Sequence, residues 1–490
     1  MDDNKYYHDM DRMMAEAEEA RARRRKLHKR NRIIAWISFV GMIAFLCVGG
    51  FFLIKSLGGS LKLPKADLRA MFAGSAPTQQ TSVSETSVSA EPEKPDIVED
   101  LTNNEQDIVV EPSEPETHEP TEQELFDAAV EAYIQAMPVD DRIAGLFIVS
   151  PEQITGVQAA VLAGDGTKKA LDTYAVGGIL YSEKNMVDSE QFKTMLSKTA
   201  EMSRYPIFLA VDEETGHGVM AEKFKLTETV SQGETGKSAD PQKAYTEESR
   251  LAVYLKEYGI NLNFGLSADV LTDPENTAAE DRTFGSDPSV VGQMTALSVR
   301  ALRDNGITAA LKFFPGEGGV TGDTSQGLVT TQRTLEEVKE CEFKSFAAGI
   351  EAGADMLLVS HIFAPNVTND AEQCSRSKNL LTDILRMEYG YDDLIIITDA
   401  LNKAAISEYY DSAETVITSL KAGADMVMLP ENFEDAYNGV SDAIKSGVVS
   451  IDRVNASLKR IYKVKLRGKT PAEVYAMAGI TPPDVSGNNQ

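Results

Sequence analysis

Short apolar runs alternate with amphipathic segments over most of the chain. Eight apolar runs rich in β-branched and aliphatic residues predict strands, at 143–149, 177–181, 206–211, 260–264, 308–314, 356–360, 394–398 and 425–429. The intervening segments carry apolar residues at helical spacing, as in 189–202, 244–258, 289–305, 335–352, 380–389 and 413–422. Near-continuous apolar strands are typical of a parallel sheet buried on both faces. Eight such units predict an α/β fold, an elaborated (β/α)₈ TIM-type barrel. An open doubly wound sheet is the alternative, although no GxGxxG motif follows the first strand.

The N-terminal part of the chain has a different pattern. Residues 1–32 are polar, and residues 21–32 carry eight basic side chains and no acidic one. The next 22 residues, 33–54, carry no charge and are long enough to cross a hydrocarbon core of about 30 Å. The basic cluster predicts a cytoplasmic N-terminus, a single-pass helix in the cell membrane and an extracytoplasmic barrel. A cleaved signal peptide is the rival interpretation, but the polar leader and the apolar run are both too long for one.

The segment after the apolar run predicts a tether. Residues 55–122 are rich in Ser, Thr, Pro, Glu and Gln, and residues 76–122 hold thirteen acidic side chains and one basic one. Such a composition buries too little apolar surface to offset ordering, so we expect a disordered acidic linker. Helical periodicity begins near Gln123, so we expect the barrel domain at 123–475 and a disordered tail at 476–490.

Charge and cysteine content exclude several kinds of partner and site. A net charge of −28 argues against nucleic acid as a partner. The three cysteines lack metal-ligand spacing. Cys341 and Cys374 lie in the part of the chain expected to fold, and the sequence is compatible with a disulfide between them or with two free thiols.

Polar residues follow the predicted strands at their C-terminal ends. They are Asp212, Glu213, Glu214, Asp269, Lys312, His361 and Asp399. On a parallel barrel these positions ring one mouth, where a Gly-rich loop at 316–327 also begins. After residue 122 only two histidines occur and no GxSxG motif is present, which excludes a three-histidine metal site and a serine elbow. The candidate catalytic groups that are left are mainly carboxylates, and these favour glycoside chemistry. A single Asp at a strand end can instead have no role beyond capping the next helix.

Several motifs together resemble glycoside hydrolase family 3, in its single-domain β-N-acetylhexosaminidase branch. They are VGGILY at 176–181, VDEETG at 211–216, NLNFGLSADVLTDPENTAAEDRTFGSDP at 261–288, KFFPGEGGVTGDTSQG at 312–327, SHIFAPNV at 360–367, LLTDILRMEYGY at 380–391 and IITDALNKAAI at 396–406. The resemblance implies a retaining hydrolase on a TIM-type barrel without a cofactor. It implies that Asp399 is the nucleophile and that Asp212, Arg282 and Lys312 hold the N-acetyl sugar, with His361 at the sixth strand end.

The chain departs from this family at the proton donor. Phe313 and Glu317 stand where the family has histidines, and Ser325 stands where the loop should carry the proton-donating histidine. Asp323, the partner of that histidine, is present. The third-strand motif also differs, with Thr215 and His217 in place of Gly and Arg. Proton transfer would therefore depend on Glu317, Asp323 or water.

Two functions are consistent with these motifs. The first is a membrane-tethered hydrolase that acts on cell-wall or other N-acetylglucosamine-containing glycans by double displacement at Asp399. The second is a catalytically inactive barrel that binds such glycans or a protein partner. Loss of general acid assistance would cost about 10² to 10⁴ in rate on poor leaving groups, so activated aryl glycosides distinguish the two.

Overall fold

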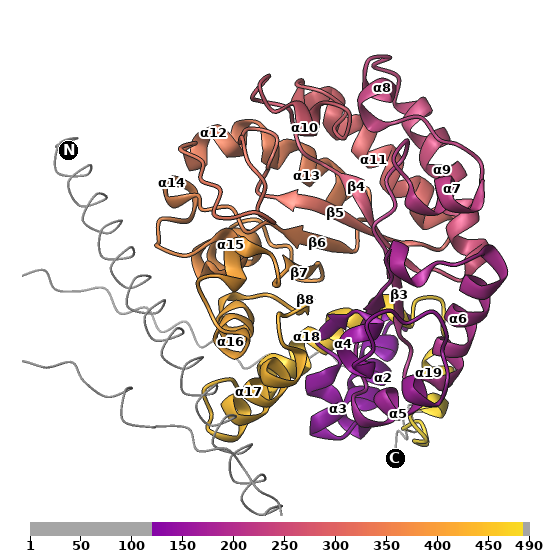
Figure 1. Ribbon diagram of the computed structural model, residues 1–490. Coiled ribbons are helices and arrows are strands. Elements are labelled where there is room, and N and C mark those ends of the chain that lie inside the picture. The colour runs from indigo at the N-terminus through magenta and orange to yellow at the C-terminus, as the bar shows by residue number, and fades with distance from the viewer. Residues whose placement is uncertain (1–119, 484–490) are drawn as a thin grey trace, which may run out of the picture. The chain divides into compact units, whose positions relative to one another are not determined.

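Eight parallel strands form a closed barrel in which each strand pairs with the next and β8 pairs with β1 (Figure 1). The computed structural model describes residues 120–483. The strands are β1 (Phe147–Val149), β2 (Gly178–Leu180), β3 (Phe208–Val211), β4 (Leu262–Ser267), β5 (Thr308–Phe314), β6 (Met356–Val359), β7 (Ile395–Ala400) and β8 (Met426–Met428). The predicted TIM-type barrel is confirmed, and the open-sheet alternative is wrong.

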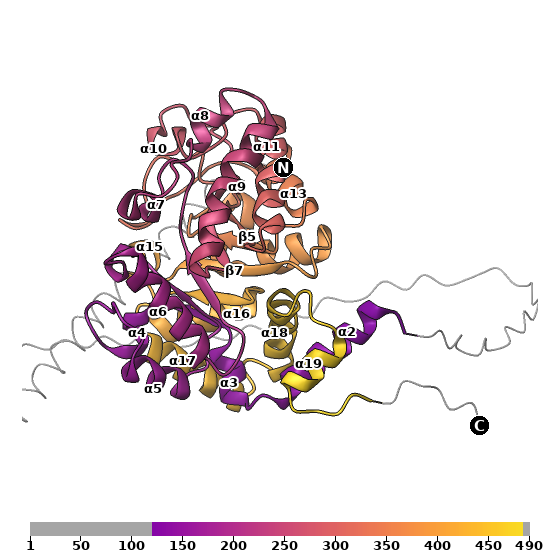
Figure 2. The same cartoon turned by 90° about the vertical axis from the view of Figure 1, so that its right-hand side faces the viewer.

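Helices surround the barrel. Along the chain they are α2 (Glu122–Ala136), α3 (Val139–Ala144), α4 (Pro151–Thr155), α5 (Asp165–Thr173), η2 (Glu183–Asn185), α6 (Ser189–Met202), α7 (Val219–Phe224), α8 (Gln232–Gly236), α9 (Pro241–Tyr258), α10 (Thr277–Glu280), α11 (Pro288–Asp304), α12 (Leu335–Glu340), α13 (Glu342–Glu351), α14 (Pro365–Thr368), η3 (Cys374–Arg376), η4 (Asn379–Glu388), α15 (Ala404–Ser407), α16 (Ser412–Ala422), α17 (Phe433–Lys445), α18 (Ile451–Lys465) and α19 (Pro471–Met477). Helix α11 packs between α9 and α13, and α2 packs against α18 and α19 (Figure 2).

Local signals in the sequence explain where several long helices begin. The side chains of Asp188, Asp240 and Asp287 accept hydrogen bonds from backbone N–H groups in the first turns of α6, α9 and α11. Proline follows directly after two of these caps, in α9 and α11, where its missing N–H costs no intrahelical bond. These helix starts follow from the local sequence.

Some predicted boundaries were wrong. The first strand begins at Phe147, because residues 143 and 144 end α3, whose first turn holds two acidic residues that favour a helix start. The predicted helix at 335–352 is interrupted at Cys341, whose backbone angles are not helical. At the C-terminus, α19 ends at Met477, and the expected end of the domain at 475 stays a prediction.

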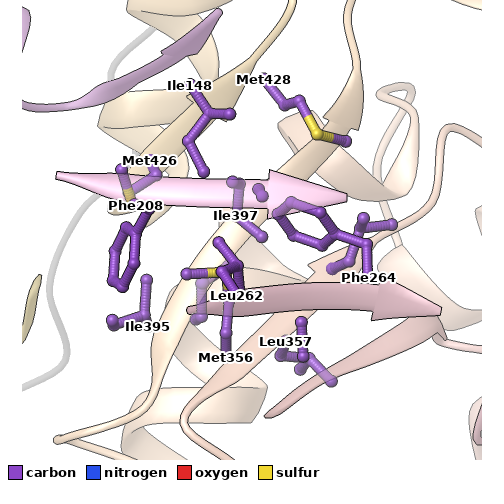
Figure 3. Packing of buried hydrophobic residues seen from close by; sticks show 14 of the residues in the cluster. Ile148, Phe208, Leu262, Phe264, Met356, Leu357, Ile395, Ile397, Met426 and Met428 are labelled. Atoms are coloured by element: carbon purple, nitrogen blue, oxygen red, sulfur yellow. The ribbon is translucent and has the colours of Figure 1, made fainter. Parts of the chain in front are cut away.

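The core of the barrel domain is apolar. Side chains from all eight strands belong to one buried cluster, and the members labelled in Figure 3 are Ile148, Phe208, Leu262, Phe264, Met356, Leu357, Ile395, Ile397, Met426 and Met428. Each of them is at most 4 % exposed. Removing this much apolar surface from water fixes the strands against one another, so polar residues just beyond the strand ends are held at one mouth.

Two remaining expectations concern cysteines and the membrane. Cys341 and Cys374 are both free, so the disulfide alternative is wrong. Within residues 120–483 no helix combines the length and the apolar character needed to cross a bilayer. The predicted basic segment, membrane helix at 33–54 and linker up to 119 lie outside the described residues, as does the tail beyond 483.

Candidate active site

A pocket of about 280 Å³ lies at the C-terminal ends of the strands. Its lining includes five predicted site residues, namely Asp212, Arg282, Lys312, Glu317 and Asp323. Asp212 follows β3, Lys312 lies in β5, and Glu317 and Asp323 lie in the loop after β5, which the chain enters through two cis peptide bonds. The barrel therefore brings together residues that are more than 100 positions apart in sequence.

Four charged side chains form an ion network on one side of this pocket. Lys312 Nζ lies 2.6 Å from Asp212 Oδ1 and 2.6 Å from Glu214 Oε1. Arg282 Nε donates to Glu214 Oε2 at 2.7 Å. The Lys312 side chain is 1 % exposed and that of Asp212 is 51 % exposed. The network therefore buries one ammonium group between two carboxylates and leaves one carboxylate facing the solvent.

The groups in this network stabilise one another in their charged forms. Burial by itself would lower the pKa of Lys312, but Asp212 and Glu214 raise it overall. Burial by itself would raise the pKa of Glu214, but Lys312 and Arg282 lower it overall. Opposite charges within a few ångströms favour the ionised state of each partner, and here that effect exceeds the cost of burial. This side of the pocket carries fixed charges at neutral pH.

Asp399, at the end of β7, is buried beside a lysine. Its Oδ1 accepts from the backbone N–H of Ala400 at 2.7 Å, and its Oδ2 lies 2.6 Å from Lys403 Nζ. Burial by itself would raise the pKa of Asp399, but the positive charge of Lys403 and the hydrogen bonds from Lys403 and Ala400 lower it overall. Asp399 is therefore an ionised carboxylate in a buried position, which is the state that a nucleophile requires.

His361 follows β6 and is fully buried. Its Nε2 donates to the carbonyl oxygen of Ala400 at 3.0 Å, and its Nδ1 lies 2.8 Å from Ser375 Oγ. Burial lowers the pKa of His361 to about 4, so the ring is neutral at physiological pH. Both nitrogens have protein partners, so His361 holds the backbone next to Asp399. Its predicted contact with substrate stays a prediction.

Glu317 lies among other carboxyl groups. Its side chain accepts a hydrogen bond from Ser360 Oγ, and its backbone N–H donates to Asp269 Oδ1 at 3.0 Å. Burial, followed by the negative charge of Asp399, raises the pKa of Glu317. Burial and Glu317 raise the pKa of Asp269 well above its usual range. This part of the pocket favours protonated carboxyl groups.

Asp323 behaves differently because it is exposed. Ser325 Oγ donates to Asp323 Oδ2 at 2.6 Å, and the Ser325 backbone N–H donates to Oδ1 at 2.7 Å. These two hydrogen bonds lower the pKa of Asp323. The position at which the family resemblance expects a histidine is thus filled by a serine that binds the retained aspartate.

The sequence interpretation missed two side chains that touch the catalytic candidates. Lys403 is the fourth residue after Asp399, and Ser360 directly follows β6. A lysine four residues beyond a strand-end aspartate is a detectable signal, but residues 401–403 form a turn rather than a helix. The direction of that side chain therefore depends on the fold.

Other cavities and clusters offer less chemistry. A cavity of about 930 Å³ lies where the strands begin, lined in part by Arg303, Asp355, Arg460 and Arg467. Arg303 and Arg467 pair with Asp355, and Arg460 pairs with Asp425, so each of these cations already has a carboxylate partner in the protein. In the described part of the chain, 120–483, no group of three or more His, Cys, Asp and Glu side chains has the arrangement of a metal site.

Comparison with known proteins identifies the family. Residues 139–464 match the model of the glycosyl hydrolase family 3 N terminal domain. The chain belongs to glycoside hydrolase family 3. The predicted resemblance to this family is confirmed.

Three similar proteins illustrate this family 3 relationship. Beta-hexosaminidase A of Pseudoalteromonas piscicida is 26 % identical over 339 residues, which cover 64 % of this chain and 56 % of that protein. Beta-hexosaminidase LpqI of Mycobacterium tuberculosis is 27 % identical over 333 residues, which cover 66 % of this chain and 82 % of that protein. A family 3 beta-N-acetylglucosaminidase from Paenibacillus sp. has the same fold, with a TM-score of 0.62 at 24 % identity over 72 % of this chain and 65 % of that one. The family 3 chain thus spans little more than half of the first of these relatives.

Proposed function

We propose that this family 3 protein is a membrane-anchored, extracytoplasmic retaining β-N-acetylhexosaminidase that acts on cell-wall or other N-acetylglucosamine-containing glycans. One observation carries the proposal: Asp399 and Glu317 belong to the same site, yet their surroundings shift their pKa values in opposite directions. Double displacement at a glycosidic bond needs one ionised and one protonated carboxyl group. The names of the relatives support an N-acetylhexosamine as the sugar.

The reaction proceeds in two steps. First, an oxygen of Asp399 bonds to the anomeric carbon while the bond to the glycosidic oxygen breaks, and Glu317 gives its proton to that departing oxygen. Then the Glu317 carboxylate takes a proton from water, the water oxygen bonds to the anomeric carbon, and Asp399 leaves as a carboxylate. One water is consumed, and both carboxyl groups return to their starting states.

Glu317 fits the role of proton donor better than Asp323. Burial and the charge of Asp399 raise the pKa of Glu317, which favours its protonated form, whereas the hydrogen bonds from Ser325 lower the pKa of Asp323 and favour its carboxylate form. Asp323 suits binding of a sugar hydroxyl at the exposed rim. In the ion network, the half-exposed Asp212 and Arg282 present groups to the sugar, and the buried Lys312 holds Asp212 in place.

The decisive experiment is the nucleophile substitution Asp399→Asn. We expect it to keep the fold and sugar binding but to remove release of the aryl group from an aryl β-N-acetylglucosaminide, because an amide cannot form the glycosyl ester. Asp442→Asn, on an exposed side chain far along α17, is the matched control and should leave turnover unchanged.

Incubation with a 2-fluoro sugar should add one glycosyl unit to the unsubstituted protein and none to Asp399→Asn, as measured by intact mass. Unchanged turnover in Asp399→Asn would remove this residue from the mechanism. A wild-type protein that binds N-acetylglucosamine oligomers but cleaves neither these nor aryl glycosides would support the binding-only alternative.

The membrane anchor is tested separately. If the apolar run at 33–54 spans the membrane with its basic flank inside, a protease added to intact cells should cut the acidic linker and release the barrel domain. Immunoblotting with an antibody to the barrel would detect the released fragment. Protection of the domain until the membrane is permeabilised would contradict the proposed orientation.

A further inference from the structure

Lys403 contacts groups from three separate parts of the active site. Its Nζ lies 2.6 Å from Asp399 Oδ2 and 3.4 Å from Thr324 Oγ1, and 5.3 Å from the centre of the Phe313 ring. Lys403 and Glu317 both line the active-site pocket. The Asp399 side chain is 5 % exposed and that of Lys403 is 23 % exposed. The lysine thus reaches a buried reacting atom from the pocket side.

We propose that Lys403 is a third catalytic residue, the shared counter-ion of Asp399 and Glu317, whose ammonium group follows the negative charge as it passes between these carboxyl groups. This inference rests on the proposed function, because it assumes that Asp399 attacks and that Glu317 donates the proton.

The reaction moves one negative charge across the pocket. Before the first step Asp399 is the anion, and Lys403 pairs with it. When Asp399 forms the glycosyl ester it becomes neutral, and Glu317 becomes the anion because it has lost its proton. The second step reverses both changes. Asp399 and Glu317 together therefore carry one negative charge before and after each step, and that charge would be costly next to the buried Asp399 without the Lys403 ammonium.

The lysine side chain is suited to follow this charge. Its flexible four-carbon stem carries a compact ammonium group with three donors, so the group can turn from one carboxylate to another without leaving the pocket. The face of the Phe313 ring lies 5.3 Å from Lys403 Nζ and 5.1 Å from Lys312 Nζ, and it attracts both cations. Thr324 Oγ1 accepts a longer hydrogen bond from Lys403 Nζ, at 3.4 Å.

The charged groups that face Lys403 come from several elements. Asp399 at the end of β7, Glu317 after β5 and Asp212 after β3 all raise the pKa of Lys403 against the opposing effect of burial. In the other direction, Lys403 lowers the pKa of both Asp399 and Asp323, and it opposes the rise at Glu317. The nearby His361 is neutral at physiological pH.

The test is the pH dependence of kcat/KM for Lys403→Met, measured with both an aryl β-N-acetylglucosaminide and a reducing-end-labelled chitooligosaccharide. Without the ammonium, Asp399 ionises at higher pH and Glu317 keeps its proton to higher pH. Both limbs of the bell-shaped profile should therefore move upward, by about 1 to 3 pH units for the limb that reports Asp399. The rate should fall with both substrates, since the charge is needed in both steps.

Three further variants make the result specific. Lys403→Arg keeps the charge and should keep both limbs close to their original pH. Lys403→Gln keeps a hydrogen-bond donor for Asp399 without a charge and should behave like Lys403→Met, which also covers the case in which the methionine variant fails to fold. Lys168→Met removes an exposed lysine paired with Asp172 on α5 and should change nothing.

The outcomes separate this inference from the proposed function. If the wild-type protein is active and neither Lys403→Met nor Lys403→Gln shifts the pH profile of kcat/KM, the counter-ion role of Lys403 is overturned and the proposed function is not. Loss confined to the chitooligosaccharide would also overturn it, because such a selective loss would show that Lys403 itself supplies the proton. An inactive wild-type protein, with no trapped glycosyl unit, would overturn both proposals.

Discussion

At the scale of single residues, burial acts alike on Asp399 and Glu317, yet the pKa of one falls and that of the other rises. The difference comes from their neighbours. Lys403 lies 2.6 Å from Asp399 and holds it ionised, whereas Glu317 faces the negative charge of Asp399 and accepts its hydrogen bond from an uncharged serine, Ser360. Two carboxyl groups in one site thereby acquire different chemical roles.

The isosteric change Glu317→Gln removes the transferable proton and keeps the shape of the side chain. We expect the rate on unactivated N-acetylglucosamine glycans to fall by about 10² to 10⁴, with a much smaller loss on aryl glycosides, whose leaving groups need little protonation. Comparison of kcat/KM on the two substrate types measures this difference. Asp323→Asn serves as the comparator. An equal loss on both substrates, or a larger selective loss in Asp323→Asn, would contradict the assignment of Glu317 as proton donor.

Ser325→His tests whether the loop can regain a family-type donor. Ser325 is exposed and already binds both carboxylate oxygens of Asp323, so an imidazole at this position has room and a partner. In a Glu317→Gln background we expect a gain of about tenfold or more on unactivated glycans, since a histidine titrates near neutral pH. Steady-state turnover measures the gain. A double variant no faster than Glu317→Gln would show that the loop does not place residue 325 near the scissile bond.

At the scale of elements, the close packing of β3 against β4 places the ion network. A Cβ added to Gly265 in β4 would overlap the backbone carbonyl of Glu213 and crowd the backbone nitrogen of Glu214. We therefore expect Gly265→Ala to lower the free energy of unfolding by about 1 to 3 kcal/mol and to weaken sugar binding by displacing Glu214. Chemical denaturation and ligand titration measure the two effects. Gly166→Ala, where an added Cβ meets nothing in the exposed helix α5, should be neutral or slightly stabilising.

At the scale of the whole molecule, the proposed active site and the ion cluster around Asp425 lie at opposite ends of the barrel strands. Asp425, fully buried before β8, pairs with Arg386 at 2.6 Å, Arg460 at 3.1 Å and Arg453 at 3.5 Å. It thus joins the start of β8 to η4 and α18. The contacts at this end of the barrel therefore stabilise the fold, whereas the pocket lies at the other end of the strands.

We expect Asp425→Ala to lower the free energy of unfolding by about 3 to 5 kcal/mol, because it removes a fully buried carboxylate that pairs with three partly buried arginines. The turnover of the remaining folded protein should be unchanged. Urea denaturation combined with activity per folded molecule measures both quantities. Asp442→Ala removes one partner of an exposed ion pair with Lys445 and should change stability by no more than about 0.5 kcal/mol. A loss of turnover in folded Asp425→Ala would show that the two ends are coupled.

The sequence by itself determined the barrel and the position of its mouth. A strand that is buried on both faces is apolar along its whole length, so eight apolar runs predicted eight strands. The polar residues at and after their C-terminal ends predicted that Asp212, Lys312, Glu317 and Asp399 lie at one mouth of the barrel. Only the tertiary structure decided what those residues do to one another. Lys312 pairs with carboxylates about 100 positions away, and the turn after β7 directs Lys403 onto Asp399. Such contacts depend on strand order, register and turn direction, and the pKa of a buried carboxyl group depends on the charges that these features place beside it.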